Sequence, residues 1–198
     1  MYGAEFSFEW QDDDARTSAW YPQGITGSGD GKASGTFDSK NVVLVSWYDD
    51  KDDGIEKGAR ISFVNVTNLS DIRYRHVLLV EPYRSNGKAT FRAADTHAGG
   101  IVWYGNYLYV ADTYGGLRVF HLGRIMRAEA DPDKDRVGII GGKAYAFDYR
   151  YVLPQVGYYE AATSFRYSFI GLDRTTSPHS MLAGEYQTDS SGRVARFS

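Results

Sequence analysis

The segment from His97 to Phe120 constrains the fold of this chain more than any other. It predicts three short β-strands, which begin after Gly100, at Leu108 and at Leu117. Asparagine and glycine bend the chain between them, while β-branched and aromatic residues suit a pleated sheet. We therefore expect an antiparallel β-meander here, and an all-β fold if the pattern recurs.

Weaker copies of this segment lie before and after it. In each copy a third strand opens with an arginine and an apolar residue, at Arg60, Arg118 and Arg193. A fourth strand follows the first two copies, at Tyr74–Pro82 and Tyr149–Pro154. Long-period repeats of this kind indicate stacked sheets. We expect a single all-β domain over residues 1–198, a partial β-propeller of about three four-stranded antiparallel blades. The expected blades cover residues 20–82, 97–154 and 164–198.

The repeat pattern also predicts an open ring. The third copy stops after its third strand, and propellers have about four to eight blades. We expect that this chain does not close the ring and is a fragment of a larger propeller. The apolar faces of its terminal blades would then favour self-association. Ala4–Trp10 alternates apolar and polar residues, which predicts an outer strand, with the third copy as one place for it to pair.

Several segments resemble known proteins. Leu108–Thr113 and Leu117–Phe120 resemble NHL-type repeat propellers. Pro22–Thr26, Tyr74–Pro82 and His97–Ile101 are similar to a group of uncharacterised secreted β-propeller-like proteins of actinobacteria. This resemblance covers most of residues 20–198. It implies a larger parent protein, a leader and an extracellular location, and it implies no activity and no catalytic residue.

Charge and cysteine content bear on several function classes. The net charge is −3 and no run of Lys or Arg occurs, so no nucleic-acid partner is expected. There is no cysteine, which excludes disulfides, thiolate catalysis and cysteine-ligated zinc. No apolar run approaches the roughly 18 residues of a membrane span. Residues 1–6 lack the basic and apolar regions of a signal peptide.

Propeller geometry assigns certain loops to one face. The loops before the first strand and between the second and third strands of each blade would surround the channel, where ligands gather. The candidate ligand-binding residues on this face are Gln23, Trp47, Tyr48, Asp95, His97 and Asp112. Glu160 and Arg166 lie near the start of the first strand of the third blade. His97 suits a general base or a metal ligand that Asp95 could orient; the alternative is a residue that caps the strand entry.

Acidic loops raise the question of calcium. Asp131, Asp133 and Asp135 alternate carboxylates, which hard cations need. Arg136 stands where a calcium loop needs glycine, and Gly142 stands where it needs an acid. Calcium is therefore a weak prediction against the alternative of a solvated loop, and no other cofactor is expected. His76 lies in an apolar strand, which favours a structural role.

Two function classes remain open. Aromatic residues near turns favour a non-catalytic extracellular recognition module that binds a carbohydrate, a peptide or a protein on the top face of the propeller. The alternative is a secreted metal-dependent hydrolase or lyase at the channel mouth, with His97, Asp112 and Glu185 as catalytic candidates. A tightly held divalent ion would favour the enzyme.

Overall fold

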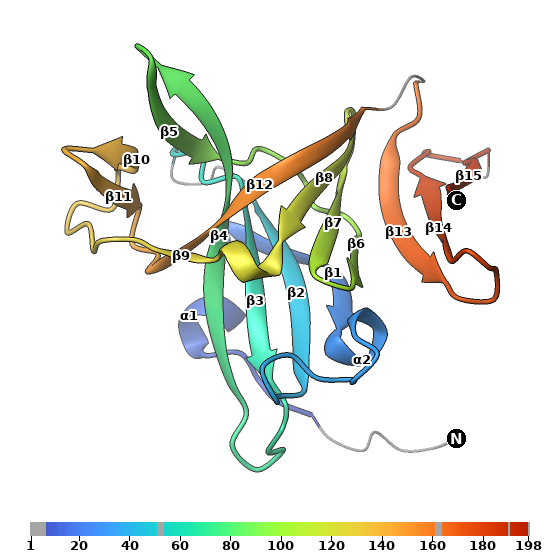
Figure 1. The fold of residues 1–198 in the computed structure, drawn as a ribbon. Coiled ribbons are helices and arrows are strands. Elements are labelled where there is room, and N and C mark those ends of the chain that lie inside the picture. Colours follow the sequence, from blue (N-terminus) through green and yellow to red (C-terminus); the bar gives the residue numbers. More distant parts are fainter. Residues whose placement is uncertain (1–6, 51–53, 161–163, 190, 198) are drawn as a thin grey trace.

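The computed structural model describes residues 7–50, 54–160, 164–189 and 191–197. It is 53% strand and 6% helix, so the prediction of an all-β fold is confirmed. Figure 1 shows a large central group of strands, a small hairpin on one side of it, and a separate sheet on the other side. The described residues contain no helix of the length and apolar character that a membrane crossing requires.

The first unit is an antiparallel meander in which consecutive strands pair. Its strands are β1 (Trp20–Gly27), β2 (Val42–Asp49), β3 (Ala59–Asn65) and β4 (Arg73–Ser85). Leu44 on β2 and Ile61 on β3 are fully buried. Burial alternates along the first part of β2, whereas Ala59, Arg60, Ile61 and Ser62 of β3 are all buried, so both faces of the sheet are covered there.

The second and third units repeat the meander. The second unit contains β6 (Ile101–Tyr104), β7 (Tyr107–Asp112), β8 (Gly116–His121) and β12 (Tyr151–Glu160). The third unit contains β13 (Tyr167–Asp173), β14 (Ser180–Glu185) and β15 (Val194–Phe197). Except for β12, these strands lie where the sequence pattern predicts them. In the described part of the chain the third unit has three strands, not four.

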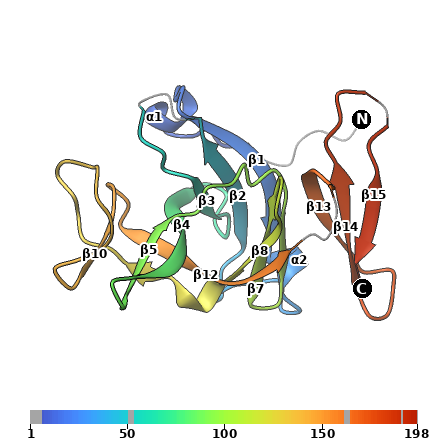
Figure 2. The same ribbon diagram turned by 90° about the horizontal axis from the view of Figure 1, so that it is seen from above.

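Strand β12 changes partner along its length. Val152–Pro154 pairs in parallel with Leu78–Val80 of β4, and from Gln155 onward β12 pairs antiparallel with β8. The prediction that Tyr149–Pro154 is the outer strand of the second unit is therefore wrong by several residues. As a result the first two units share one sheet, in the order β1-β2-β3-β4-β12-β8-β7-β6. Figure 2 shows β12 crossing the molecule towards the third unit.

The ends of this shared sheet approach each other. The backbone N–H of Trp103 on β6 donates to Oγ1 of Thr26 on β1, at 3.3 Å. The sheet is therefore barrel-like and nearly closed. Separate blades are the defining feature of a propeller, and the shared sheet departs from it.

The long intervals between the repeats, residues 83–96 and 123–144, are predicted as loops from the sequence, but both contain strands. β4 continues into a hairpin with β5 (Lys88–Ala93) around Asn86 and Gly87, which both have positive φ angles of 50° and 75°. β10 (Val137–Ile140) and β11 (Lys143–Ala146) form a second hairpin around Gly141 and Gly142. Asn-Gly and Gly-Gly between strands are the expected signals of such tight turns. A 3₁₀ turn η1 (Leu122–Arg124) and a short strand β9 (Met126–Arg127) precede the second hairpin.

The N-terminal region differs from its prediction. Within Ala4–Trp10, residues 4–6 lie outside the described residues, and residues 7–10 form no strand. Trp10 instead packs edge-on against Trp47 and Tyr74 of the first unit. Two four-residue helices follow, α1 (Asp12–Ala15) and α2 (Ser28–Gly31). The acidic residues of α1 lie in its first turn, where the helix dipole favours negative charge.

Glycines let the inner strands of the three units approach closely. A Cβ atom at Gly24 would lie 2.8 Å from the backbone N of Ile101, which belongs to the second unit. A Cβ atom at Gly100 would lie 2.3 Å from the backbone N of Ile170, which belongs to the third unit. Buried clusters fill the space behind them, one between the first two units around Leu44 and another around Ile170. The three inner edges therefore meet in one place.

Candidate functional site

A cavity of about 410 Å³ lies where the inner edges of the three units meet, and we name it the inner-edge cavity. Its described lining comes from residues in or just before the first strand of each unit, and from the turns after β7 and β14. The lining residues are Gln23, His97, Gly99, Thr113, Tyr114, Arg166, Tyr167, Ser168 and Tyr186. The volume falls in the range of small-ligand pockets, about 300–1,000 Å³.

Backbone contacts fix the walls of this cavity. The N–H of Tyr167 donates to the carbonyl of Thr113, at 3.0 Å, and the N–H of Tyr186 donates to the carbonyl of Arg166, at 2.8 Å. Oγ1 of Thr96 donates to the carbonyl of Ala111, at 3.2 Å. The cavity therefore rests on strand ends that hydrogen bonds hold together.

Arg166 is the charged centre of the cavity. Its guanidinium lies over the rings of Tyr114 and Tyr186, 5.3 and 4.8 Å from their centroids. Nη2 of Arg166 also donates to the hydroxyl of Tyr114, at 3.2 Å. Such cation–π contacts hold the guanidinium in place without using most of its N–H groups. The sequence pattern places Arg166 near the start of the third blade but predicts no role for it.

His97 lies beside aromatic rings and makes no hydrogen bond to Asp95, although both residues are described. Its ring is 4.5 Å from that of Tyr48, and Tyr48 stacks on Tyr21 at 5.5 Å. Gln23 donates from Nε2 to the carbonyl of Pro22. The structure thus brings Gln23, Tyr48 and His97 to one edge of the molecule, and Asp95 does not orient His97 by a hydrogen bond.

Arginines engage the two predicted catalytic carboxylates. Asp112 accepts from Nε of Arg118 at 2.9 Å, and Arg118 also donates to the carbonyl of Asp95. Glu185 accepts two hydrogen bonds from Arg193, both 2.7 Å long, and its side chain is 1% exposed. These bonds to Arg193 hold the pKa of Glu185 at about 2. Glu185 is therefore a poor general acid or base.

Trp47 is not available to a ligand. It is 1% exposed, and its indole N–H donates to Oγ of Ser62 at 2.8 Å. The sequence pattern places it next to a turn, but Trp47 belongs to the buried cluster around Leu78, on the face of β2 opposite Leu44, and Tyr48 is partly exposed. Trp47 is therefore removed from the candidate ligand-binding residues.

The acidic loop at Asp131 is closed by an arginine. Oδ1 of Asp131 accepts from Nε and Nη2 of Arg136, and Oδ2 accepts from the backbone N–H groups of Asp135 and Arg136. Asp133 and Asp135 are exposed. Among the described residues no three His, Asp or Glu side chains gather as a metal site would require. Calcium binding stays a prediction, and the Asp131 carboxylate is already occupied.

A second cluster, which the sequence did not reveal, surrounds Asp14 of α1. Oδ2 of Asp14 accepts from Tyr74 at 2.6 Å and faces Nε2 of His76 at 2.9 Å. Oδ1 accepts from Nη2 of Arg60 at 2.8 Å, and the Arg60 side chain is 6% exposed. Arg60 also lies over the rings of Trp20 and Trp47 and donates to the hydroxyl of Tyr149. We name these residues the Asp14 cluster.

Ser62 gives the Asp14 cluster a superficial likeness to a hydrolase triad. Its Oγ lies 2.9 Å from Nδ1 of His76. Ser62 is fully buried and already accepts from Trp47, so no substrate can reach it. The order of contacts also differs from the usual triad, where the serine faces Nε2 and the acid faces Nδ1. The arrangement ties α1 to the first unit.

We expect the protein to lose stability as the pH falls. Burial lowers the pKa of His76 below its usual 6.5, so its protonation favours unfolding. Burial opposes the ionisation of Asp14, but hydrogen bonds from His76 and Tyr74 outweigh it and hold its pKa well below 3.8. Each group stabilises the folded state fully above its own unfolded-state pKa, and this stabilisation declines as the pH falls.

Urea midpoints should drop between pH 7 and pH 5, and His76→Gln should flatten that part of the profile. A midpoint that rises on acidification would contradict this.

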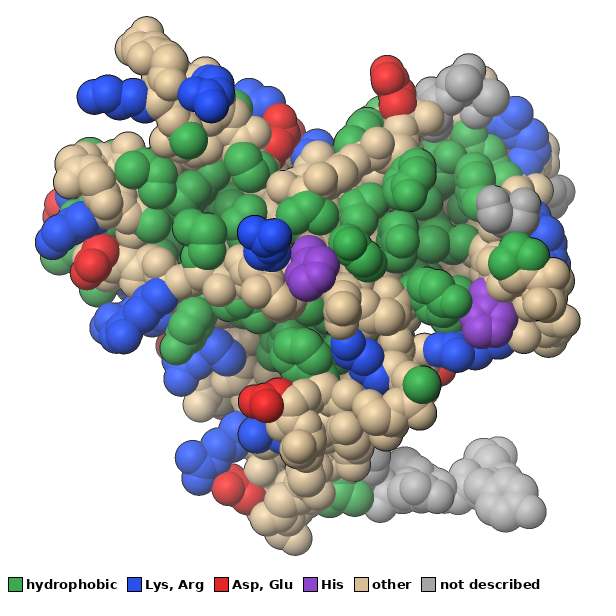
Figure 3. Space-filling model, viewed as in Figure 1, with side chains coloured by type: hydrophobic (Ala, Val, Ile, Leu, Met, Phe, Trp, Pro, Cys, Tyr) green, Lys and Arg blue, Asp and Glu red, His purple; other side chains and the backbone are tan. Residues whose placement is uncertain are grey.

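A larger groove of about 620 Å³ separates the second and third units away from the inner edge. Aromatic side chains line most of it, including Tyr109, Tyr159 and Phe197. Figure 3 shows hydrophobic side chains gathered on this face.

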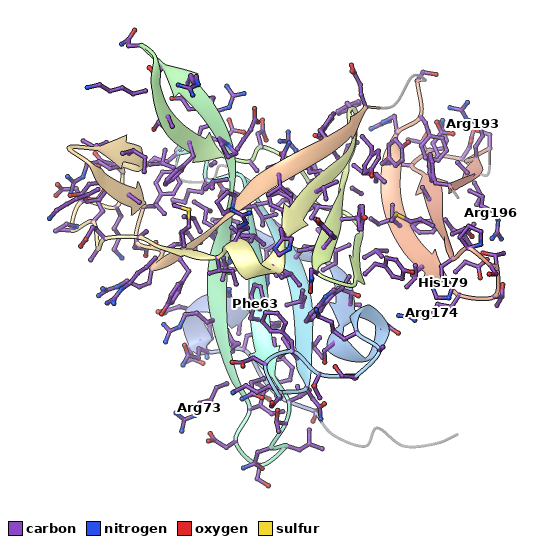
Figure 4. All side chains as sticks on the ribbon, in the orientation of Figure 1. Phe63, Arg73, Arg174, His179, Arg193 and Arg196 are labelled. Carbon is purple, nitrogen blue, oxygen red and sulfur yellow. The ribbon has the colours of Figure 1, made fainter. Side chains whose placement is uncertain are left out.

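Figure 4 places His179 and Arg174 at one end of the third sheet and Arg193 at the other. Since Arg193 binds Glu185 beside the entry to β13, the inner-edge cavity lies towards the Arg193 end.

Comparison with protein-family models, with curated proteins and with solved structures finds no match to this chain.

Proposed function

We propose that this chain is a non-catalytic recognition module that binds a carbohydrate, a peptide or a protein through the inner-edge cavity. The observation that carries the proposal is the lining: all three units contribute polar or aromatic groups to one half-open cavity. Aromatic rings with a few convergent polar groups are typical of binding pockets. Tyr114 is 75% exposed and Tyr186 is 47% exposed, so both can contact a ligand.

The finer fold and the setting belong to the same proposal. We infer that the three units form an arc of a β-propeller, which β12 distorts by joining the first two sheets. The close approach of the inner strands at Gly24 and Gly100 supports this arrangement. An extracellular location follows from the resemblance to secreted proteins. The apolar groove between the second and third units supports self-association.

A metal-dependent hydrolase or lyase remains the alternative, with less support. It would need His97, Asp112 and Glu185 to act on one substrate. Asp112 and Glu185 are bound to Arg118 and Arg193, so either would have to break an ion pair before it could hold a metal. Metal analysis of the purified protein tests the alternative, and a stoichiometric divalent ion would favour it.

We expect Tyr114→Ala to weaken ligand binding by about tenfold, because loss of a buried aromatic contact costs about 1–2 kcal/mol. A glycan array and a peptide library would first identify ligands, and calorimetry would then compare the variants. Tyr107→Ala is the matched control, since Tyr107 lies at the opposite end of β7 and is 42% exposed. Equal losses in both variants, or no binding by the unaltered protein, would contradict the proposal.

A further inference from the structure

We propose that the inner-edge cavity binds an acidic carbohydrate, with Arg166 as the residue that takes its carboxylate. This inference rests on the proposed recognition function and deepens it by naming the class of ligand. The juxtaposition that carries it is a partly buried arginine, held between two tyrosine rings, in a cavity whose described lining contains no acidic side chain.

The charge balance of the cavity favours an anion. Arg166 and His97 line it, and no Asp or Glu is among its described lining residues. Asp112 and Glu185 lie in the strands that flank it, and each is ion-paired with its own arginine. Oε1 of Glu185 also accepts from the backbone N–H of Arg166 at 3.4 Å, but Glu185 forms no ion pair with the Arg166 guanidinium. The guanidinium charge of Arg166 is therefore not cancelled by a described neighbour, and a ligand carboxylate would meet attraction without local repulsion.

Arg166 differs from the three arginines that recur in the repeats. Arg60, Arg118 and Arg193 each form an ion pair with a carboxylate. Arg166 forms none with a described residue. Its Nε is buried without a hydrogen-bond partner in the described structure, as is Nε of Arg60, but only Arg166 lines the inner-edge cavity. A buried N–H group that lacks a partner costs free energy, and a bound acceptor would remove that cost.

The tyrosine rings prepare Arg166 for this role. Tyr114 and Tyr186 position the guanidinium through ring contacts, and only Nη2 is engaged by a hydroxyl. The planar guanidinium can therefore present a pair of N–H groups to the two oxygens of a carboxylate. Little side-chain entropy is lost on binding, because the rings already hold the arginine.

The remainder of the lining suits a sugar better than a peptide. Exposed tyrosine faces pack on the apolar faces of sugar rings, and Gln23, Thr113 and Ser168 offer polar groups to hydroxyls. Peptides more often bind along an open strand edge or in a helix groove, whereas loop and strand ends enclose this cavity. The carboxylate would distinguish an acidic sugar from its neutral relatives.

The experiment compares trigalacturonate with its fully methyl-esterified form, which keeps the sugar rings and removes the charge. We expect the unaltered protein to bind the acid at least about tenfold more tightly than the ester, since charge-assisted bonds contribute about 1.5–3 kcal/mol. Arg166→Gln should abolish this preference for the acid over the ester, and Arg166→Lys should keep part of it. Circular dichroism and melting would show whether each variant is folded.

The outcomes separate this inference from the proposed function. Equal binding of acid and ester by the unaltered protein overturns the acidic-ligand inference and leaves recognition intact, and this comparison needs no variant. Binding of library peptides that Tyr114→Ala abolishes, with no binding of either saccharide, also overturns only the inference. An absence of binding to saccharides, peptides and proteins alike overturns both.

Discussion

Replacement of Asp14 by alanine should lower the free energy of unfolding by about 3 kcal/mol, because a buried charge that loses its partner costs about 3–5 kcal/mol and Asp14 is 15% exposed. Arg60, 6% exposed, would keep its charge in a site lined by Trp20 and Trp47. Tyr74 and His76 would lose an acceptor in the same step. Urea unfolding monitored by tryptophan fluorescence measures the change.

Asp12→Ala is the control for this prediction. Asp12 lies on the same helical turn and is exposed, so its removal should change the free energy of unfolding by no more than about 0.5 kcal/mol. Asp14→Asn, which keeps the shape and removes the charge, should fall between the two. If Asp14→Ala were as stable as Asp12→Ala, the ion pair with Arg60 would contribute little to stability. The prediction that the Asp14 cluster stabilises the fold would then be wrong.

Substitution of Gly100 by alanine should detach the third unit from the second. The new Cβ atom would lie 2.3 Å from the backbone N of Ile170 and 2.7 Å from Cα of Phe169, and backbone atoms cannot move aside cheaply. Overpacking of this kind costs about 1–3 kcal/mol or more. Hydrogen exchange should show lost protection in β13–β15 while β2 and β3 keep theirs.

Gly171→Ala provides the matched control, since a Cβ atom there would have no described heavy atom outside its immediate neighbours within 4 Å. Gly171 lies on β13, one residue beyond Ile170, so both changes alter the same interface region. The Gly100 variant should also lose ligand binding, because Arg166 and Tyr186 belong to the third unit. Full protection of β13–β15 in Gly100→Ala would show that the units do not pack as described.

Much of the strand order could be predicted from the sequence, because the pattern of apolar residues has a period of two. The strands around Leu108 and Leu117 lie where the sequence predicts them. The hairpin at Asn86 was missed although its Asn-Gly pair is a strong local signal. The error there came from treating a long interval between repeats as a loop.

The partner change in β12 and the Asp14 cluster could not be predicted in the same way. Val152 pairs with Leu78, and no local pattern specifies a contact between residues so far apart in sequence. Asp14 lies in an acidic run typical of a solvated loop, and only its contacts with Arg60 and His76 reveal its role. The propeller arc, the ligand and the location stay predictions.

The partner change of β12 also bears on how the chain emerges during synthesis. Leu78 of β4 pairs with Arg60 of β3, and Val80 pairs with Ala93 of β5. Until Val152–Pro154 leaves the ribosome, the edge of Leu78–Val80 that pairs with β12 stays open. An open strand edge with buried-type side chains is prone to pair with other chains. A nascent chain that pauses before Val152 would therefore expose this edge, and the second unit shields the first as soon as its last strand arrives.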